Sequence, residues 1–269
     1  MPQSRLRLCR SILFLPASNP RAIEKARELD ADMIILDCED AVKDADKEEA
    51  RRAAVAAVAE GFGDRLTAIR INAAGGEYYG SDVVALRNSK ADFVILPKAE
   101  NPDQIRDTAN LTTKPALAMI ETAAGVLHAS AIAPATAGLI AGTNDLSADL
   151  GLPVGGSRFG LHHSLQMIVL AARAHRVAAF DGVYNGLADD AGLARQCEEG
   201  RSFGFDGKSL IHPSQIETAN RLFSPDEAEI EAARRLIEAA TGGAERHEGR
   251  MIESMHVDQA RSVLAKARR

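Results

Sequence analysis

Acidic side chains stand at the ends of three apolar runs in this chain. "MIILDCED" reaches Asp37, Glu39 and Asp40, "AMIE" ends at Glu121, and "LIAGTND" ends at Asp145. Mg²⁺ prefers hard carboxylate oxygens and keeps several waters, so two acids can hold it. Glu121 and Asp145 have no His or Cys cluster beside them, as zinc would prefer. The two acids therefore predict a magnesium site. The alternative is that each one caps the helix that follows it.

Two basic residues also end apolar runs. Arg70 lies in "IRIN", where a guanidinium without a partner would be costly to bury, and its fork suits a bidentate grip on a carboxylate or enolate. The alternative is an internal salt bridge to Asp37 or Glu39. The two interpretations are compatible, because the salt bridge can form in a site without ligand. Lys98, which ends "ILPK", is in a place where a Schiff-base lysine could sit. Nearby carboxylates would keep it charged, so charge balance or substrate attraction is favoured over a class I aldolase.

Eight short apolar runs alternate with longer segments of helical period. The predicted strands are 11–16, 33–37, 66–72, 92–98, 116–122, 137–143, 177–183 and 208–213. Asn19-Pro20 and Asn101-Pro102 predict helix starts between them. This alternation indicates an α/β fold, a (β/α)₈ TIM barrel. All strands of such a barrel end at one face, where the polar residues above would meet.

The predicted domain organisation is a barrel over residues 1–223 and a C-terminal extension over 224–269. The extension should contain one helix, a glycine-rich hinge "TGGAERHEGR" and a short last helix that acts as a lid. A chain of 269 residues is long for one average domain but ordinary for one barrel.

Composition argues against several classes of protein. The net charge is -6 and the basic residues are scattered, which argues against nucleic-acid binding. Three cysteines without C-x-x-C spacing argue against a disulfide framework and favour a reducing cytoplasm. Charges interrupt every long apolar stretch, and the N-terminus lacks a cleavable signal pattern. We therefore expect a cytoplasmic protein that does not span a membrane.

Seven segments together carry a family resemblance. They are "RSILFLPASNPRAIEKA", "ILDCEDAVKDADKEEAR", "IRIN", "ILPKAE", "IETAAGV", "GTNDLSADLG" and "IHPSQIETANRLFSPDEAEIEAARRLIEAA". In this order they resemble the HpcH/HpaI aldolase and citrate lyase beta-subunit family, in particular its citrate lyase beta-subunit-like branch. The resemblance implies a barrel dependent on Mg²⁺, for which Mn²⁺ can substitute. It also implies a lyase that makes or breaks a carbon–carbon bond between a 2-oxo acid and the acetyl unit of a coenzyme A thioester of the citryl, malyl or citramalyl class.

The resemblance also assigns roles to the strand-end residues. Glu121 and Asp145 would bind the metal, and Arg70 would hold the keto-acid oxygen. Glu39 and Asp40 would hydrogen-bond the metal-bound waters.

Further roles follow from the same resemblance. Asp37 would support the two acids that follow it. Arg21 and Lys25 match positions near the coenzyme's phosphates, although a solvated helix face is an equal alternative. In family members that act on coenzyme A esters, the tail folds over a neighbouring subunit and supplies an acid from a G-x-M-[IV]-D motif. Here "GRMIES" places Glu253 at that aspartate, one methylene longer. The expected assembly is a homotrimer or a multiple of one.

The same residues are compatible with two other functions. One is an aldolase for a free 2-oxo-4-hydroxy acid, which would use the same metal and Arg70 but no coenzyme groove. The other is a subunit whose substrate is carried on an acyl-carrier protein partner.

Overall fold

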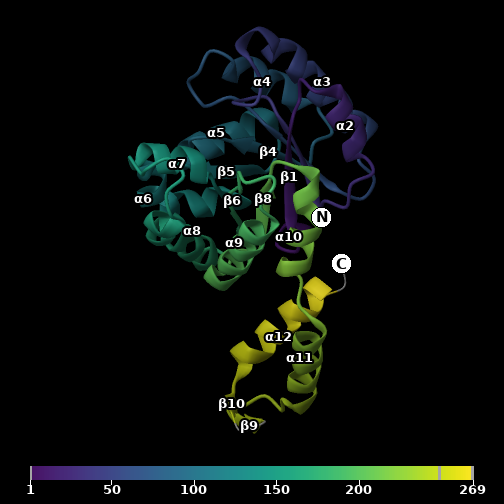
Figure 1. Cartoon of the computed structure of the whole chain (residues 1–269), viewed down its shortest axis with the longest axis vertical. Helices are drawn as coiled ribbons and strands as arrows, with labels where there is room; N and C mark the ends of the chain where they lie inside the picture. Colours follow the sequence, from purple (N-terminus) through teal and green to yellow (C-terminus); the bar gives the residue numbers. More distant parts are fainter. Residues whose placement is uncertain (1, 248–249, 268–269) are drawn as a thin grey trace.

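Eight parallel strands form a closed barrel in the computed structural model, which describes residues 2–247 and 250–267 (Figure 1). The strands are β1 (Ser11–Pro16), β2 (Met33–Asp37), β3 (Leu66–Arg70), β4 (Phe93–Leu96), β5 (Ala116–Ile120), β6 (Gly138–Ala141), β7 (Ala178–Asp181) and β8 (Gly207–Leu210). They pair in chain order, and β8 closes the ring on β1. The predicted (β/α)₈ barrel is confirmed. Each predicted run coincides with one strand, and β3 to β8 end two or three residues earlier than predicted.

Helices surround this barrel on the outside (Figure 1). They are α2 (Pro20–Ala26), α3 (Lys47–Glu60), α4 (Tyr79–Arg87), α5 (Pro102–Thr112), α6 (Ala123–Ile132), α7 (Thr143–Asp149), α8 (His162–Ala174), α9 (Asp190–Phe203) and α10 (Ile216–Phe223), with short 3₁₀ turns η1 (Asp44–Asp46), η2 (Ala133–Ala135), η3 (Arg158–Leu161) and η4 (Pro213–Gln215). The short N-terminal helix α1 (Pro2–Leu6) instead contributes Leu6 to the core inside the barrel. The Asn19 side chain caps α2, and Asn101 forms a capping box with Gln104 at α5. Both predicted helix starts are therefore confirmed.

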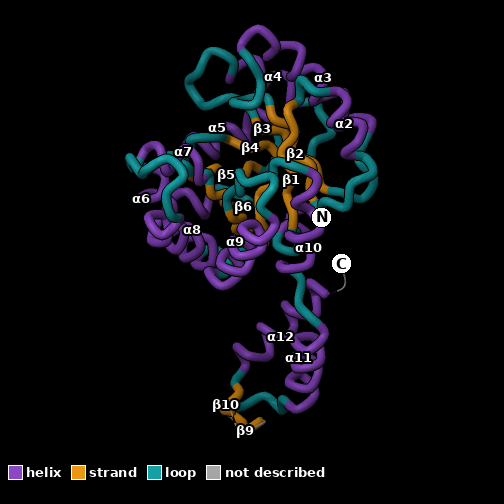
Figure 2. Tube along the Cα trace, viewed as in Figure 1, coloured by secondary structure: helices purple, strands orange, loops and turns teal. Residues whose placement is uncertain are grey.

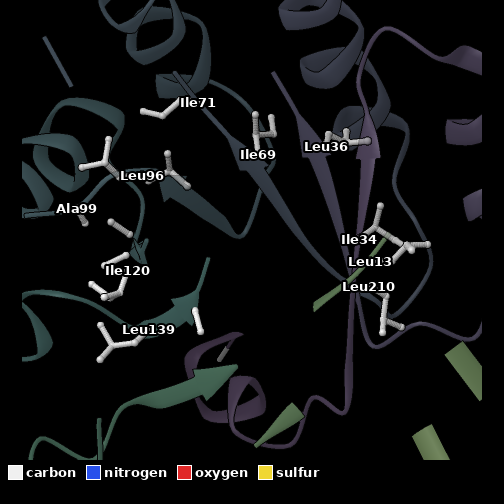
Figure 3. Close-up of a cluster of buried hydrophobic side chains, with 14 of the residues drawn as sticks. Leu13, Ile34, Leu36, Ile69, Ile71, Leu96, Ala99, Ile120, Leu139 and Leu210 are labelled. Atoms are coloured by element: carbon white, nitrogen blue, oxygen red, sulfur yellow. The ribbon is translucent and has the colours of Figure 1, made fainter. Parts of the chain in front are cut away.

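Strand residues alternate between two apolar cores. Ile34 and Leu36 of β2 face outward and pack under the helices (Figure 3), whereas Met33 and Ile35 fill the barrel interior. Since side chains alternate along a strand, Asp37 continues the inward set. The same parity holds for Arg70 after Leu66 and Ala68, and for Glu121 after Leu117 and Met119. Alternation thus places three charged side chains over the apolar interior, at the carboxyl ends of β2, β3 and β5.

The C-terminal extension projects away from the barrel as a pair of helices (Figures 1 and 2). It consists of α11 (Glu227–Ala239), β9 (Glu245–His247), β10 (Arg250–Ile252) and α12 (Ser254–Ala267), and α12 packs along α11. The predicted hinge was partly wrong, because Glu245–His247 pairs with Arg250–Ile252 as an antiparallel two-stranded ladder. The predicted last helix is present, but α12 is longer than expected, with 14 residues. Strands of three residues are too short to leave a periodic pattern.

One end of α12 is attached to the barrel. Lys266 donates a hydrogen bond to the backbone carbonyl of Asp206, just before β8, and its ammonium lies 5.7 Å from the ring centroid of Phe223. Asp206 precedes its strand, so this contact lies at the face opposite the strand ends that carry the acids. Within the described residues, no helix is both long and apolar enough to cross a membrane.

The interior core supports a stability prediction. Phe93 is fully buried inside the barrel, whereas Phe159 is 76% exposed. We expect Phe93→Ala to lower the free energy of unfolding by about 3–5 kcal/mol, because it leaves a cavity among packed side chains. Phe159→Ala should change it by less than about 0.5 kcal/mol. Urea denaturation measures both, and equal losses would contradict the assignment of Phe93 to the core.

Candidate active site

A cavity of about 390 Å³ opens at the carboxyl ends of the strands. Its wall contains five of the residues singled out in the sequence, namely Asp37, Asp40, Arg70, Glu121 and Asp145. The other lining residues are Phe14, Leu15, Pro16, Ala41, Met119, Ala141, Gly142, Thr143, Asn144, Val183 and Ile211. The barrel therefore brings together residues that are far apart in the chain, at the face where barrel enzymes hold their sites.

Arg70 is held by two carboxylates. Its Nε and Nη2 donate to the two oxygens of Asp37 at 2.7 and 2.5 Å, and its Nη1 lies 2.9 Å from Oε2 of Glu39. Burial alone would lower the pKa of Arg70, but the hydrogen bonds and charge of Asp37 raise it above its ordinary value. The internal salt bridge foreseen from the sequence is therefore present. The guanidinium still lines the cavity, where a ligand carboxylate could share it.

Glu121 is a buried carboxyl group with one oxygen left over. Its Oε1 accepts a hydrogen bond from the backbone N–H of Lys98 at 2.8 Å, while its Oε2 has no hydrogen-bond partner among the described residues. Burial, followed by the charge of Glu39, raises the pKa of Glu121 to about 8. A buried carboxylate oxygen without a donor, in a cavity wall, fits a cation.

The second candidate metal ligand, Asp145, lies in the first turn of α7 and is half-buried. Gly142 occupies the N-cap of α7 without a side-chain bond, and the hydroxyl of Thr122 caps α6. Neither Asp145 nor Glu121 is a capping residue, so the capping alternative was wrong for both. The described residues contain no group of three or more His, Cys, Asp or Glu side chains placed to hold a metal. Glu121 and Asp145 lie in one cavity wall, and two carboxylates suit a hard cation that keeps its waters, so the predicted magnesium site stays a prediction.

The loop after β2 separates its three acids. Asp37 accepts from the backbone N–H groups of Glu39 at 2.9 Å and Ala41 at 3.3 Å, which folds the loop back on the strand end. Glu39 is buried against Arg70, and burial raises its pKa. Asp40 is exposed and lines the cavity. Two of the acids thus bind Arg70, and the third faces the opening.

Lys98 contacts the site through both its backbone and its side chain. Its backbone has φ of +48°, a left-handed conformation that is uncommon for a side-chain-bearing residue. In this conformation its N–H reaches Glu121, and its Nζ lies 3.3 Å from Oε1 of Glu39. Burial lowers the pKa of Lys98, but the charges of Glu39 and Asp40 and the hydrogen bond to Glu39 together raise it above its ordinary value. A charged ammonium is a poor nucleophile, which disfavours the Schiff-base alternative. Lys98 is not among the residues that line the cavity.

Three other candidates lie outside the cavity wall. Arg21 and Lys25 are exposed on α2. Glu253 is exposed just before α12, where its backbone N–H donates to Nδ1 of His256 at 3.0 Å. Figure 1 shows this end of α12 in the projecting extension, away from the barrel. Glu253 therefore does not reach the cavity of its own chain.

The sequence interpretation missed two residues that shape the site. Gly142 approaches Glu121 so closely that an added Cβ would lie 2.4 Å from the Glu121 Cβ, so only glycine fits there. Lys47 is buried and holds the loop that carries Glu39. The sequence did contain a signal for Gly142: a glycine at the end of an apolar run, just before "TND", indicates a close approach of the backbone to another group. Lys47 gave none, because it lies in the charged run "DADKEEARR".

Comparison with known proteins decides the family. The model of the HpcH/HpaI aldolase/citrate lyase family matches residues 10–213, and that of the C-C bond lyases of the TIM-barrel fold matches residues 161–269. The chain belongs to the HpcH/HpaI aldolase/citrate lyase family. The family resemblance drawn from the sequence is therefore confirmed.

Individual relatives cover nearly the whole chain. A (3S)-malyl-CoA thioesterase of Cereibacter sphaeroides strain KD131 is 44% identical over 96% of this chain and 94% of its own length. The citrate lyase subunit beta of Leuconostoc mesenteroides subsp. cremoris is 32% identical over 98% and 92%. The crystal structure of CitE from Mycobacterium tuberculosis with magnesium, acetoacetate and coenzyme A matches with a TM-score of 0.81 and 34% identity, covering 96% of this chain and 98% of that one.

These relatives settle the family but divide on the reaction. One relative is a subunit of citrate lyase, whereas the Cereibacter protein is a malyl-CoA thioesterase. The predicted lyase reaction therefore stays a prediction, although membership of the lyase family is shown.

The raised pKa of Glu121 predicts a pH dependence of stability in metal-free protein. Between its ordinary pKa of 4.5 and the folded value of about 8, the folded state keeps a proton that the unfolded state has lost. The free energy of unfolding should then fall as pH rises, by up to about 1.4 kcal/mol per pH unit. Urea denaturation with EDTA at pH 5, 6.5 and 8 measures this slope.

Substitution isolates the contribution of Glu121 to that slope. Glu121→Gln removes the proton equilibrium, so its slope should be shallower than that of the wild type. Glu217→Gln, at an exposed position on α10, is the matched control and should keep the wild-type slope. Identical slopes for all three proteins would contradict the raised pKa.

Proposed function

We propose that this chain is a Mg²⁺-dependent enzyme that acts on a β-hydroxy acyl-coenzyme A thioester of the malyl type, and that it hydrolyses the thioester. The observation that carries the metal assignment is the buried Oε2 of Glu121, which has no donor and lies in the cavity wall that also contains Asp145 and Arg70. Two carboxylates without nitrogen or sulfur ligands fit Mg²⁺, with Mn²⁺ as a substitute.

Each site residue then has a defined task. Glu121 and Asp145 would hold the ion, which supplies Lewis-acid stabilisation of negative charge on a substrate oxygen. Arg70, fixed by Asp37, would bind the free carboxylate of the acyl group through its charge and remaining donor capacity. Glu39 and Asp40 would accept hydrogen bonds from waters beside the ion.

Thioester hydrolysis is supported by two observations. A (3S)-malyl-CoA thioesterase is 44% identical along nearly the whole chain, whereas the citrate lyase subunits are 32% identical. The tail carries Glu253 where the related coenzyme A lyases are expected to have aspartate. In hydrolysis, water adds to the thioester carbonyl, the carbon–sulfur bond breaks, and coenzyme A leaves as the thiol together with malate.

Carbon–carbon cleavage is the second candidate. It is supported by the match of residues 161–269 to the C-C bond lyases. It would convert the same malyl thioester into acetyl-coenzyme A and glyoxylate.

The coenzyme arm would enter over α2. This helix follows the carboxyl end of β1, so its first turn lies at the mouth of the barrel. Arg21 and Lys25 are exposed on it and carry the charge that phosphates need. The related CitE structure contains coenzyme A, which supports a coenzyme site in this family.

Product analysis tests the proposed function. With (3S)-malyl-coenzyme A and Mg²⁺, hydrolysis releases free thiol and malate in equal amounts and no 2-oxo acid. Appearance of glyoxylate with acetyl-coenzyme A would instead establish the lyase. Turnover of only a free 2-oxo-4-hydroxy acid, or of only an acyl-carrier-protein thioester, would replace the proposal with the aldolase or the carrier-dependent subunit.

The metal assignment predicts the effect of neutral substitutions. Glu121→Gln and Asp145→Asn should lower kcat at least about 1000-fold, because each removes a charged ligand of an ion worth several kcal/mol to the transition state. Steady-state kinetics over a range of Mg²⁺ concentrations measures the loss, and circular dichroism checks the fold. Glu217→Gln should keep the wild-type rate. Full activity in either ligand variant would sink the metal assignment.

A tail acid predicts complementation between subunits. Glu253 does not reach its own cavity, so it can serve only the site of another copy. Glu253→Ala should lower kcat about 100-fold if it acts in proton transfer. Mixing this variant with inactive Glu121→Gln protein and allowing subunits to exchange should restore part of the rate. Unchanged turnover in Glu253→Ala would show that the tail acid is not used.

A further inference from the structure

Lys47, the first residue of α3, is a buried lysine with an unusual set of partners. Its side chain is 6% exposed, and its Nζ donates to the carbonyl of Glu39 at 2.7 Å, to the carbonyl of Cys38 at 3.1 Å and to Oδ1 of Asn72 at 2.8 Å. These three acceptors use all three donors of the ammonium group. None of the three is a charged group, although burial of a charge normally calls for an opposite one.

The acceptor Asn72 is itself fixed. Its Nδ2 donates to Oδ2 of Asp82 at 2.6 Å and to the carbonyl of Cys38 at 3.1 Å, and its backbone N–H donates to the same Asp82 oxygen at 2.8 Å. Asp82 in turn pairs with Arg51, one turn after Lys47 on α3, at 2.6 Å. The network therefore ties the start of α3 and the end of β3 to the loop after β2.

The two carbonyls that Lys47 binds belong to the peptide units on either side of the Glu39 Cα. Fixing both units fixes the two backbone torsions of Glu39, and these torsions set the direction of its side chain. On the other side of the loop, the Glu39 carboxylate lies 2.9 Å from Nη1 of Arg70 and 3.3 Å from Nζ of Lys98. One buried ammonium thus sets the backbone from which this carboxylate extends.

We propose that Lys47 is a positioning residue that aims the Glu39 carboxylate at Arg70 and at the waters beside the bound cation. Lys47 is not among the residues lining the cavity, so it acts without touching the substrate. This inference rests on the proposed function of the cavity. It assigns a role in that function to Lys47, which lies outside the cavity wall.

The test compares Lys47→Met with Lys43→Met, which changes an exposed lysine four residues earlier. A misplacement of about 1 Å at a catalytic group can reduce a rate by about 100-fold. We expect Lys47→Met to lower kcat about 10- to 100-fold and to change KM by less than about threefold. Lys43→Met should match the wild type. Unchanged kcat in Lys47→Met would overturn the proposal.

A double-mutant cycle separates positioning from general destabilisation. In the Glu39→Gln background, Lys47→Met should cause almost no further loss, because the group that it positions is already disabled. Losses that multiply would overturn the proposal. Lys47→Arg, which retains charge and donors, should recover part of the rate. If Lys47→Met does not fold, the same cycle is run with Asn72→Ser, with the same two outcomes.

A structural readout keeps the proposal testable apart from the proposed function. If the wild-type protein turns over none of the thioesters, the proposed function fails. A crystal structure of Lys47→Met then decides the inference: the 2.9 Å contact between Arg70 and Glu39 should be lost. An unchanged contact would overturn the positioning role.

Discussion

The buried guanidinium of Arg70 is the constraint around which the site is built. Strand alternation points Arg70 inward over an apolar interior, where it is 8% exposed and an uncompensated charge would be very costly. Asp37 on the neighbouring strand supplies a bidentate partner, and Glu39 supplies a second carboxylate from the following loop. The loop must therefore fold back over the end of β2. Its turn places Asp40 at the opening, so the contacts of Arg70 and the hydrogen bonds of Lys47 to this loop together determine where the three acids lie.

The arrangement around Arg70 leaves one carboxylate oxygen of Glu121 without a hydrogen-bond donor in the part of the chain that the structure describes. Arg70 is already shared by two carboxylates, so Glu121 is buried with only a backbone N–H from Lys98 and one free oxygen. Burial, followed by the charge of Glu39, raises its pKa to about 8. Because ionisation of Glu121 is unfavourable in the folded protein without a cation, this residue lowers the free energy of unfolding at neutral pH. Sites commonly show such a conflict between stability and function, and a cation would relieve this one.

The sequence predicted the barrel well because its signals are local. Apolar runs bounded by polar residues identify strands, and strand ends that share one face bring Asp37, Arg70 and Glu121 together before any coordinates are known. Features that depend on packing between distant segments were not predictable. Lys47 has the sequence surroundings of a solvated helix start and becomes buried only because α3 docks on the loop after β2. The β9–β10 ladder likewise arises where α11 and α12 reverse direction.

Hydrolysis and carbon–carbon cleavage of a malyl thioester need the same bound substrate and differ in which bond breaks. On the proposed function, the barrel supplies what both share, namely the cation ligands and Arg70. The two reactions differ in the position at which a proton is removed or donated. A displacement of the proton-transferring group by about 1 Å is enough to change the rate by about 100-fold. Glu253 differs from aspartate by about that length and lies outside its own cavity. The choice of reaction would then depend on how one copy's tail meets another copy's barrel.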